Sequence, residues 1–247
     1  MRREHRRAGH RRRDRPLFGG RAACVRCGRS LRRSHRHGCR RARDPRGLID
    51  MLEVELKSVV DDVERCRAAV EQAGATLVFA GRLEDRRWDT PDRAMLARDH
   101  VLRVRVYRGG GHARSELEWK GPTRRDTNYK LREELGTSVS DPDALAEILT
   151  QLGYEVSIAI DRVVVQYDLG GAMVRFEHYP RMDDLVEVEG TPEQIERAIA
   201  VLGLVRGGFT TDRLPDFVRR YEERTGGRAA ISDADLAGDG SYDVSNA

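Results

Sequence analysis

The sequence predicts an α+β domain built around an antiparallel sheet of about eight strands. Apolar and charged residues alternate in many short stretches, as they do in half-buried strands. The connections between these stretches are short and carry turn signals typical of hairpins. Three or four segments with helical spacing separate them, and all of these elements fall within residues 51–225.

The predicted strands follow one another along the domain with few interruptions. A turn is expected at Thr90-Pro91-Asp92, a flexible hairpin tip at Gly109–Gly111, and a strand end at Gly121-Pro122. The expected strands are 52–59, 76–80, 86–88, 101–107, 115–120, 129–139, 156–167, 172–178 and 185–189.

Helices are predicted at 61–73, 142–152, 192–202 and 214–224. Asp141 is a candidate N-cap of the second helix, and Thr191 opens the third. After the last helix, residues 226–247 are small and polar, so we expect a disordered tail.

The first 50 residues differ from the domain in charge. They hold 18 Arg against four acids, a net +14, whereas residues 51–247 carry a net −10. This basic and disordered arm could bind nucleic acid through phosphates. The alternative is an upstream extension from a misplaced start, because the regular pattern opens at Met51. The arm also holds zinc-compatible ligand types, although their second half is irregular: Cys24, Cys27, His35, His37 and Cys39.

Composition excludes several classes of protein. No apolar run reaches the roughly 18 residues of a membrane span, and the first residues lack the apolar segment of a secretory signal. Four cysteines do not make a disulfide scaffold and fit a reducing cytoplasm. We therefore expect a cytoplasmic protein without a membrane partner, and a homodimer is left open.

Six of the predicted strands carry charges of both signs on a single face. In a flat sheet that face would be solvated, whereas in a closed barrel it would line a polar interior. Lys and Arg side chains suit a polyanion, and Glu side chains suit hard divalent cations. Together they describe a site for a metal–polyphosphate complex. The charges on this face are Glu53, Glu55, Lys57, Arg103, Arg105, Glu116, Glu118, Lys120, Lys130, Arg132, Glu134, Arg175, Glu177, Glu187 and Glu189.

The lysines point the same way. The chain has 42 Arg and only three Lys, at positions 57, 120 and 130, and all three fall on the charged face. The ordinary explanation is Arg-biased codon usage with three chance survivors.

These residues resemble the CYTH superfamily, also called triphosphate tunnel metalloenzymes, and within it the class IV adenylate cyclase-like branch. Six segments match the family's motifs in order over residues 51–220. They are the ExExK at Glu53–Lys57, the aromatic-x-D-T-P-D at Trp88–Asp92, the L-R-x-R at Leu102–Arg105, the K-G-P at Lys120–Pro122, the R-E-E at Arg132–Glu134 and the E-x-E-G at Glu187–Gly190.

The resemblance implies a closed eight-stranded antiparallel β-barrel, the triphosphate tunnel, with helices packed outside, and it makes residues 51–225 a CYTH domain. It also implies Mg²⁺ or Mn²⁺ as cofactor and a triphosphate-containing substrate. The metal ligands would be Glu55 and Glu187, with Glu53, Glu177 and Glu189 beside them. The phosphate-binding residues would be Lys57, Arg103, Arg105, Lys120, Lys130, Arg132, Arg162 and Arg175. Among these residues, Lys57, Arg105, Glu55 and Glu187 are the candidates for catalytic roles.

Two positions depart from the family pattern. Ile160 stands where the family often has the Lys of a K-x-R, so one phosphate contact is missing. Glu177 stands where close relatives often place Asp, and Glu reaches further toward a metal.

Three functions remain open from the sequence. The first is a metal-dependent phosphohydrolase of inorganic or organic triphosphate. The second is a class IV-type adenylate cyclase making cAMP from ATP, and the third is a module that binds polyphosphate or nucleotides without turnover. No P-loop or Rossmann pattern competes, because Gly109–Gly111 lacks both the Lys-Ser/Thr and the following helix.

Overall fold

The structure is a computed structural model that describes residues 54–238, apart from residues 111, 127–128 and 132. The side chains of residues 54, 112 and 124–131 are also outside this description. The arm of residues 1–50, with its candidate zinc ligands, lies outside the described residues, as does Glu53.

Eight strands form one antiparallel sheet in the order β1-β10-β9-β8-β2-β3-β4-β7. A separate pair, β5 and β6, forms a small hairpin. The α+β class and the eight-stranded antiparallel sheet are thereby confirmed. The strand bounds are β1 Val54–Val59, β2 Thr76–Asp89, β3 Val101–Gly109, β4 His112–Lys120, β5 Arg124–Asp126, β6 Tyr129–Leu131, β7 Glu134–Val139, β8 Glu155–Leu169, β9 Ala172–His178 and β10 Leu185–Gly190.

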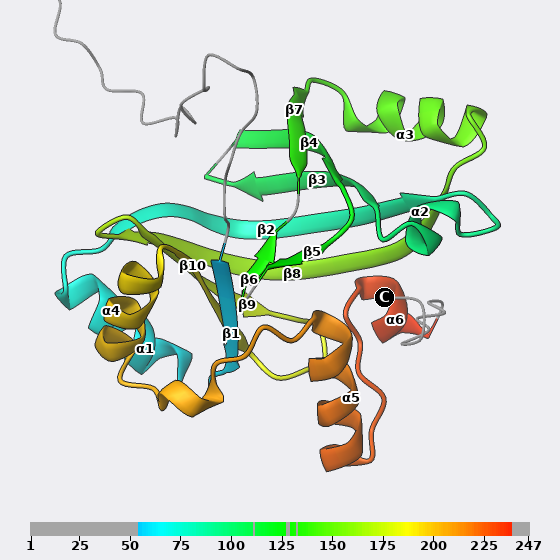
Figure 1. The fold of residues 1–247 in the computed structure, drawn as a ribbon. Helices are drawn as coiled ribbons and strands as arrows, with labels where there is room; N and C mark the ends of the chain where they lie inside the picture. The colour runs from blue at the N-terminus through cyan, green and yellow to red at the C-terminus, as the bar shows by residue number, and fades with distance from the viewer. Residues whose placement is uncertain (1–53, 111, 127–128, 132, 239–247) are drawn as a thin grey trace, which may run out of the picture. The chain divides into compact units, whose positions relative to one another are not determined.

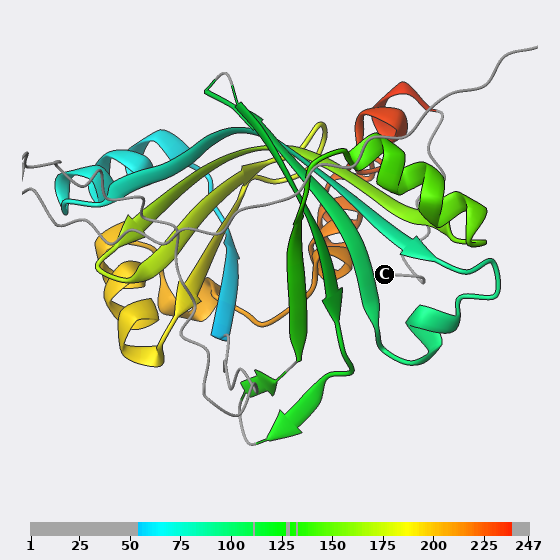
Figure 2. The same cartoon turned by 90° about the horizontal axis from the view of Figure 1, so that it is seen from above.

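The closed barrel that the resemblance implied is not seen. The sheet curls strongly, and its edge strands β1 and β7 lie on opposite sides of its concave face (Figures 1 and 2). Within the described part of the chain, β1 and β7 share no backbone pairing. The pairing that is seen joins each strand to its neighbours in an open, curved sheet.

Two strand predictions differ from the structure. The segments 76–80 and 86–88 belong to one long strand, β2, which pairs with β8 along almost its whole length. Gly81 makes this continuity feasible, because a Cβ there would lie 2.3 Å from the Arg108 carbonyl oxygen of β3. The single strand expected at 129–139 is instead divided into β6 and β7.

The helices begin where the sequence places caps. The Asp62 carboxylate accepts the backbone N–H of Arg65, Asp141 accepts from Asp143 and Ala144, and Thr191 forms a capping box with Gln194. The helices are α1 Val63–Gln72, α2 Ala94–Ala97, α3 Pro142–Gln151, α4 Pro192–Leu202, α5 Leu214–Thr225 and α6 Asp233–Ala237, with a 3₁₀ turn at Arg206–Gly208. In the described part of the chain, no helix is long and apolar enough to cross a membrane.

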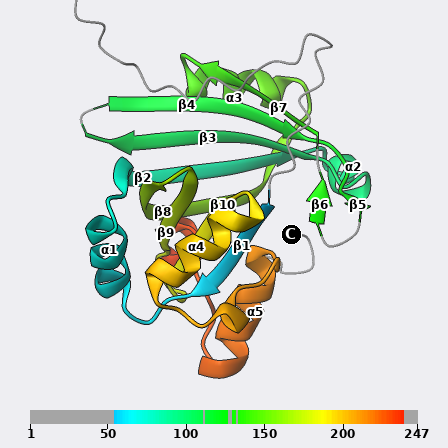
Figure 3. The same cartoon turned by 60° about the vertical axis from the view of Figure 1, so that its left-hand side comes forward.

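Helices α1, α3 and α4 cover the convex face of the sheet, opposite the charges. Helices α1 and α4 lie side by side (Figure 3) and pack Cys66, Val70 and Ile195 against Val186 and Val188 of β10. Helix α3 packs Leu149 against Trp88 and Val104. The alternation predicted from the sequence is confirmed where apolar residues of β1, β3 and β10 pack against these helices.

Helix α5 is the exception, because it packs on the concave face. Its Phe217 and Val218 join a cluster with Ile158, Ile160 and Leu185. The two isoleucines share the strand face of Arg162, two residues further along β8. Helix α5 therefore covers one end of the charged face.

The expected disordered tail is wrong for its first part. Ala230, Ile231 and Ser232 are buried, and Ala230 pairs with Arg181 through two backbone hydrogen bonds. The Asp161 N–H donates to the Ile231 carbonyl at 2.8 Å, and Ile231 enters the α5 cluster. Tertiary packing orders this segment, and helix α6 follows it; residues 239–247 lie outside the described residues.

Candidate active site in the concave face

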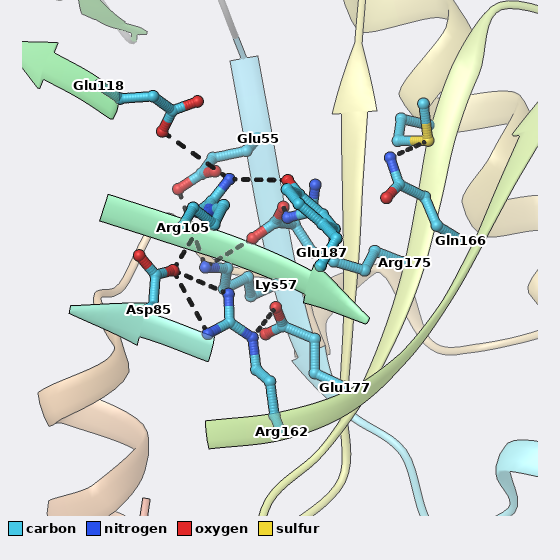
Figure 4. A network of polar contacts seen from close by, with 12 residues as sticks. Glu55, Lys57, Asp85, Arg105, Glu118, Arg162, Gln166, Arg175, Glu177 and Glu187 are labelled. Atoms are coloured by element: carbon cyan, nitrogen blue, oxygen red, sulfur yellow. Dashed lines mark hydrogen bonds and ion pairs between the residues drawn. The ribbon is translucent and has the colours of Figure 1, made fainter. Parts of the chain in front are cut away.

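A cavity of about 240 Å³ occupies the concave face, and charged side chains from all eight strands of the sheet line it. Figure 4 shows many of them converging from different strands. The charged lining residues on these strands are Glu55, Lys57, Asp85, Arg87, Arg103, Arg105, Lys120, Glu134, Arg162, Arg175, Glu177, Glu187 and Glu189.

Strands β2, β3 and β8 form the basic wall of the cavity, which consists of Arg87, Arg103, Arg105, Arg162 and Asp85. The Arg105 Nε lies 3.1 Å from Asp85 Oδ2, and Arg162 Nη2 lies 3.4 Å from the same oxygen. Burial raises the pKa of Asp85, but the positive charges of Arg105, Arg103 and Arg162 outweigh it and hold that pKa well below its usual range. Asp85 is therefore ionised among four guanidinium groups.

Strands β1, β9 and β10 form the acidic wall, which consists of Glu55, Glu177, Glu187 and Glu189 with Lys57 and Arg175. Glu187 stands directly opposite Lys57 on β1 and opposite Arg175 on β9. Lys57 Nζ and Arg175 Nη1 each lie 2.6 Å from one of its two carboxylate oxygens. Although burial raises the pKa of Glu187, these two cations hold it far below its usual range.

Glu177 links the two walls. It accepts a hydrogen bond from Arg162 Nε of the basic wall at 2.9 Å, and one from the Tyr179 hydroxyl at 2.8 Å. Burial raises the pKa of Glu177, but the charges of Arg162, Lys57 and Arg175 together outweigh it and lower that pKa. The Tyr179 hydroxyl is buried beside this carboxylate, and both effects raise the pKa of Tyr179 well above its usual value.

Glu55 and Glu189 are the carboxylates of the acidic wall with the fewest partners. They face each other across β1 and β10, an arrangement of like charges that destabilises the empty sheet. Glu55 is half-exposed and approaches Lys57 at only 4.0 Å, and Glu189 forms no ion pair with another described residue. The two side chains offer the hard oxygen ligands that Mg²⁺ and Mn²⁺ prefer.

This donor set fits a metal held together with substrate. In the described part of the chain, no three His, Cys, Asp or Glu side chains converge in a geometry that could hold a metal ion. Mg²⁺ is commonly bound by one or two carboxylates, with water and substrate phosphates completing its shell. Two opposed carboxylates beside a phosphate-sized cavity match that requirement.

Ion pairs also mark the side of the cavity toward the β7 edge. Arg103 Nε donates to Glu118 on β4, and Lys120 Nζ lies 2.6 Å from Glu134 on β7. Although burial raises the pKa of Glu118, the charges of Arg103, Arg105 and Lys120, with the hydrogen bond from Arg103, together lower it below its usual value. Internal ion pairs are thus present in the basic wall, in the acidic wall and toward the β7 edge.

The structure gathers most of the residues predicted from the sequence into this one cavity. Glu53 and Arg132 lie outside the described residues, and Lys130 lies on β6 with its side chain outside them. The predicted residues that line the cavity are Glu55, Lys57, Arg103, Arg105, Lys120, Arg162, Arg175, Glu177, Glu187 and Glu189.

Sequence reasoning missed Asp85, Arg87, Tyr179 and Arg213, all of which line the cavity. Asp85 and Arg87 share a strand face with the buried Leu83, and the opposite face of this stretch is also charged. Apolar and charged residues therefore do not alternate here, and no local pattern distinguishes the cavity-lining face. Tyr179 follows the end of β9 and Arg213 precedes α5, where no periodicity guides a prediction.

The family model of the CYTH domain matches residues 51–196, more than half of the chain. The chain belongs to the CYTH family. CYTH proteins generally use divalent metals and bind triphosphate substrates, which agrees with the charges of this cavity. A search of curated proteins found no match.

Solved structures support the CYTH fold. A putative adenylate cyclase from Vibrio parahaemolyticus is 19% identical with a TM-score of 0.58, and the match covers 68% of this chain and 98% of that one. Two proteins of Pyrococcus horikoshii OT3 are similar. One is 24% identical with a TM-score of 0.54, covering 65% of this chain and 94% of its own. The other is 22% identical with a TM-score of 0.53, covering 67% and 98%. At such identities the likeness shows the fold.

Proposed function

We propose that this CYTH chain is a divalent-metal-dependent phosphohydrolase acting on a triphosphate-containing substrate. The supporting observation is that a basic wall faces an acidic wall across one cavity. Guanidinium groups bind phosphate oxygens in a bidentate manner, and carboxylates bind hard cations. A cavity with both takes a metal–polyphosphate complex better than either component alone.

The phosphate-binding role falls to the cations of both walls and of the β7 side. These are Lys57, Arg103, Arg105, Lys120, Arg162 and Arg175, to which the family pattern adds Lys130 and Arg132. In the substrate-free protein, Lys57 and Arg175 are held by Glu187. Phosphate oxygens would compete with Glu187 for these cations and free its carboxylate.

The metal-binding role falls first to Glu55 and Glu189, because among the described residues no cation lies closer than 4.0 Å to either carboxylate. Glu53, Glu177 and Glu187 complete the candidates, and Glu187 becomes available only when its two cations turn to phosphate. A divalent cation bound there would neutralise phosphate charge and acidify a water molecule.

The chain's own residues would orient the substrate and stabilise charge. Phosphoryl transfer spreads negative charge over the transferred oxygens, so catalysis consists mainly of positioning and electrostatic stabilisation. Arg105 and Lys57 are placed on opposite walls to do this. Water would attack the terminal phosphorus, and the bond from that phosphorus to its bridging oxygen would break. The remaining diphosphate, free or attached to the organic group, would leave, and the attacked phosphoryl group would be released as orthophosphate with the loss of a proton from the water.

The closed tunnel belongs to the same proposal. Lys57 lies on the edge strand β1, and Lys120 lies on β4 beside the other edge strand, β7. A polyphosphate contacting both lysines would bridge the open side of the sheet and complete a tunnel around itself.

A second candidate is a class IV-type adenylate cyclase, and one observation favours an organic triphosphate. Leu214 and Pro215 of α5 line the cavity, and Leu214 packs in the cluster of Ile160 and Tyr179, which also line it. Leu96 and Val101 add apolar lining from the α2–β3 segment. An apolar surface of this kind suits a base or another organic group.

One assay panel tests these functions. Tripolyphosphate, ATP and thiamine triphosphate are each incubated with the full chain and Mg²⁺ or Mn²⁺, and both phosphate and cAMP are measured. Phosphate release supports the phosphohydrolase, and cAMP with pyrophosphate supports the cyclase. Calorimetric binding without either product would identify a binding module and overturn both enzyme assignments. The double variant E55Q/E189Q is the background control for contaminating phosphatases.

A further inference from the structure

Asp85 occupies the centre of the basic wall. Among the described cavity-lining residues of β2, β3 and β8 it is the single carboxylate, and it is 2% exposed. The middle strand, β2, carries it between β3 and β8. Arginines from all three strands surround it, and their charges together lower its pKa.

The geometry ties Asp85 to two arginines on different strands. Asp85 is the cross-strand partner of Arg105, whose Nε donates to Asp85 Oδ2 at 3.1 Å. On the other side, Arg162 places Nη1 and Nη2 at 3.5 and 3.4 Å from the same oxygen. One oxygen atom therefore holds guanidinium groups from β3 and β8 toward each other (Figure 4).

The way Arg105 is held leaves its outer nitrogens available. Its Nε donates to Asp85, whereas the contacts of Nη1 with described residues are long, 3.4 Å to the Tyr107 hydroxyl and 3.9 Å to Glu118. An arginine whose guanidinium is held through Nε can still donate hydrogen bonds from its Nη groups to a phosphate. Arg105 is itself buried, so its orientation depends on this partner.

Asp85 is poorly suited to contact the substrate itself, because a carboxylate among phosphates adds repulsion. Its carboxylate acts instead on the neighbouring arginines. Four guanidinium groups repel one another, and buried charges need a partner to stay in place. We propose that Asp85 is a positioning residue that fixes Arg105 and Arg162 in the orientation that binds the polyphosphate. The identity of that ligand rests on the proposed function.

The alternative explanation is that Asp85 competes with the ligand for the arginines. If Asp85 only competes with the ligand for the arginines, neutralising it should strengthen polyphosphate binding, because the cavity becomes more positive. Positioning and competition thus predict changes of opposite sign in the same affinity.

The test compares Asp85→Asn with Glu84→Gln. Glu84 is the adjacent residue on the other face of β2, and it also pairs with two arginines, Arg82 at 3.1 Å and Arg108 at 3.2 Å. Each variant removes one ion-paired carboxylate charge from the same strand. The ligand is tripolyphosphate without metal, and its Kd is measured by calorimetry on the full chain. NMR detection of the Arg105 Nε–Hε signal and the Arg162 Nη–Hη signals reports how firmly the groups that contact Asp85 are held in the unliganded protein.

We expect Asp85→Asn to weaken tripolyphosphate binding about tenfold or more and to broaden both arginine signals, while Glu84→Gln changes neither by more than about twofold. Unchanged or tighter binding by Asp85→Asn would overturn the proposal. A wild type that shows protected arginine signals but no tripolyphosphate binding would refute the proposed function and leave the anchoring of the arginines standing.

A second comparison covers the case in which Asp85→Asn does not fold. The tripolyphosphate affinity of Arg105→Gln is compared with that of the double variant D85N/R105Q. Both variants keep Arg162. If Asp85 acts through both arginines, the double variant binds tripolyphosphate several-fold more weakly than Arg105→Gln and loses the Arg162 signal. Equal affinity and an unchanged signal would contradict the role of Asp85 in placing Arg162.

Discussion

The two walls of the cavity solve the same problem of buried charge in opposite ways. The acidic wall carries four carboxylates and two cations, and the basic wall carries four guanidinium groups and one carboxylate. In the acidic wall, Glu187 saturates both of its oxygens with cations while Glu55 and Glu189 face each other with little compensation. In the basic wall, one carboxylate serves several arginines.

This difference indicates what each wall lacks. The acidic wall has carboxylates that need a cation, and the basic wall has guanidinium groups that need an anion. Internal pairs such as Arg162 with Glu177 join the walls when no ligand is present. A ligand that carries both charges, a metal ion on a polyphosphate, would complete both walls together.

The largest expected effect comes from the acidic wall. Glu55→Gln should lower turnover of the best substrate about 100-fold or more, because it removes a charged metal ligand at nearly constant size. Affinity for tripolyphosphate without metal should stay the same or rise. Glu64→Gln on the exposed face of α1, where the carboxylate pairs only with Arg67, is the control. Full activity of Glu55→Gln over a metal titration would remove this residue from the metal site.

A smaller loss is expected from the basic wall. Arg103→Gln should lower kcat/KM about 10- to 100-fold, because one donor to the phosphate oxygens is lost, while the metal concentration for half-maximal activity stays unchanged. Arg108→Gln on the same strand is the control, since Arg108 is exposed and pairs with Glu84 outside the cavity. If Arg103→Gln shifts the metal concentration for half-maximal activity as much as Glu55→Gln does, the two walls do not have separate roles in binding phosphate and metal.

Both walls should contribute to the pH dependence of stability. The pKa values of Asp85 and Glu187 are lowered in the folded protein, so their stabilisation is complete above the ordinary carboxyl pKa of about 4 and is lost as pH falls below it. The melting temperature should therefore be flat from about pH 8 to 6 and fall steeply below about pH 4. Asp85→Asn should melt earlier at pH 7 and lose less on acidification. If the melting temperature of Asp85→Asn falls as steeply below pH 4 as that of the wild type, Asp85 contributes little to the acid sensitivity of the fold.

The smallest effect is expected outside both walls. Lys120 and Glu134 are partly exposed, so their ion pair should contribute only about 0.2–1 kcal/mol to folding. Glu134→Gln should leave the thermal midpoint nearly unchanged and increase tripolyphosphate affinity slightly, because Lys120 is released from a competing carboxylate. A loss of several kcal/mol in chemical denaturation would show that this pair is structural.

Much of the arrangement could be predicted from the order of residues. Strand parity placed Lys57, Arg103, Arg105 and Glu187 on one face, because each alternates with an apolar residue that packs against helices. Alternate residues of a strand share one face whatever the fold, so this feature can be predicted from the sequence alone.

What could not be predicted depends on cross-strand register and on packing between distant segments. That Glu187 lies between Lys57 and Arg175 follows from the pairing of β10 with β1 and β9, which no local pattern encodes. Asp85 was missed because the stretch around Gly81 reads as a break, whereas pairing with β8 carries the strand through it. Ile231 was assigned to a disordered tail for the same reason, since its neighbours in the cluster come from α5 and β8.

The pairing of β1 with β10 also bears on when this site can form. The first strand of the domain finds its hydrogen-bonding partner only near the end of the sheet, so Lys57 and Glu187 meet across most of the domain's length. Such non-local contacts are formed late and slow the folding of a chain, because a large loop must close first. During synthesis, β1 must wait unpaired until β10 has left the ribosome. A truncated or stalled chain would then possess much of the basic wall but not the complete acidic one, and could hold phosphate without being able to act on it.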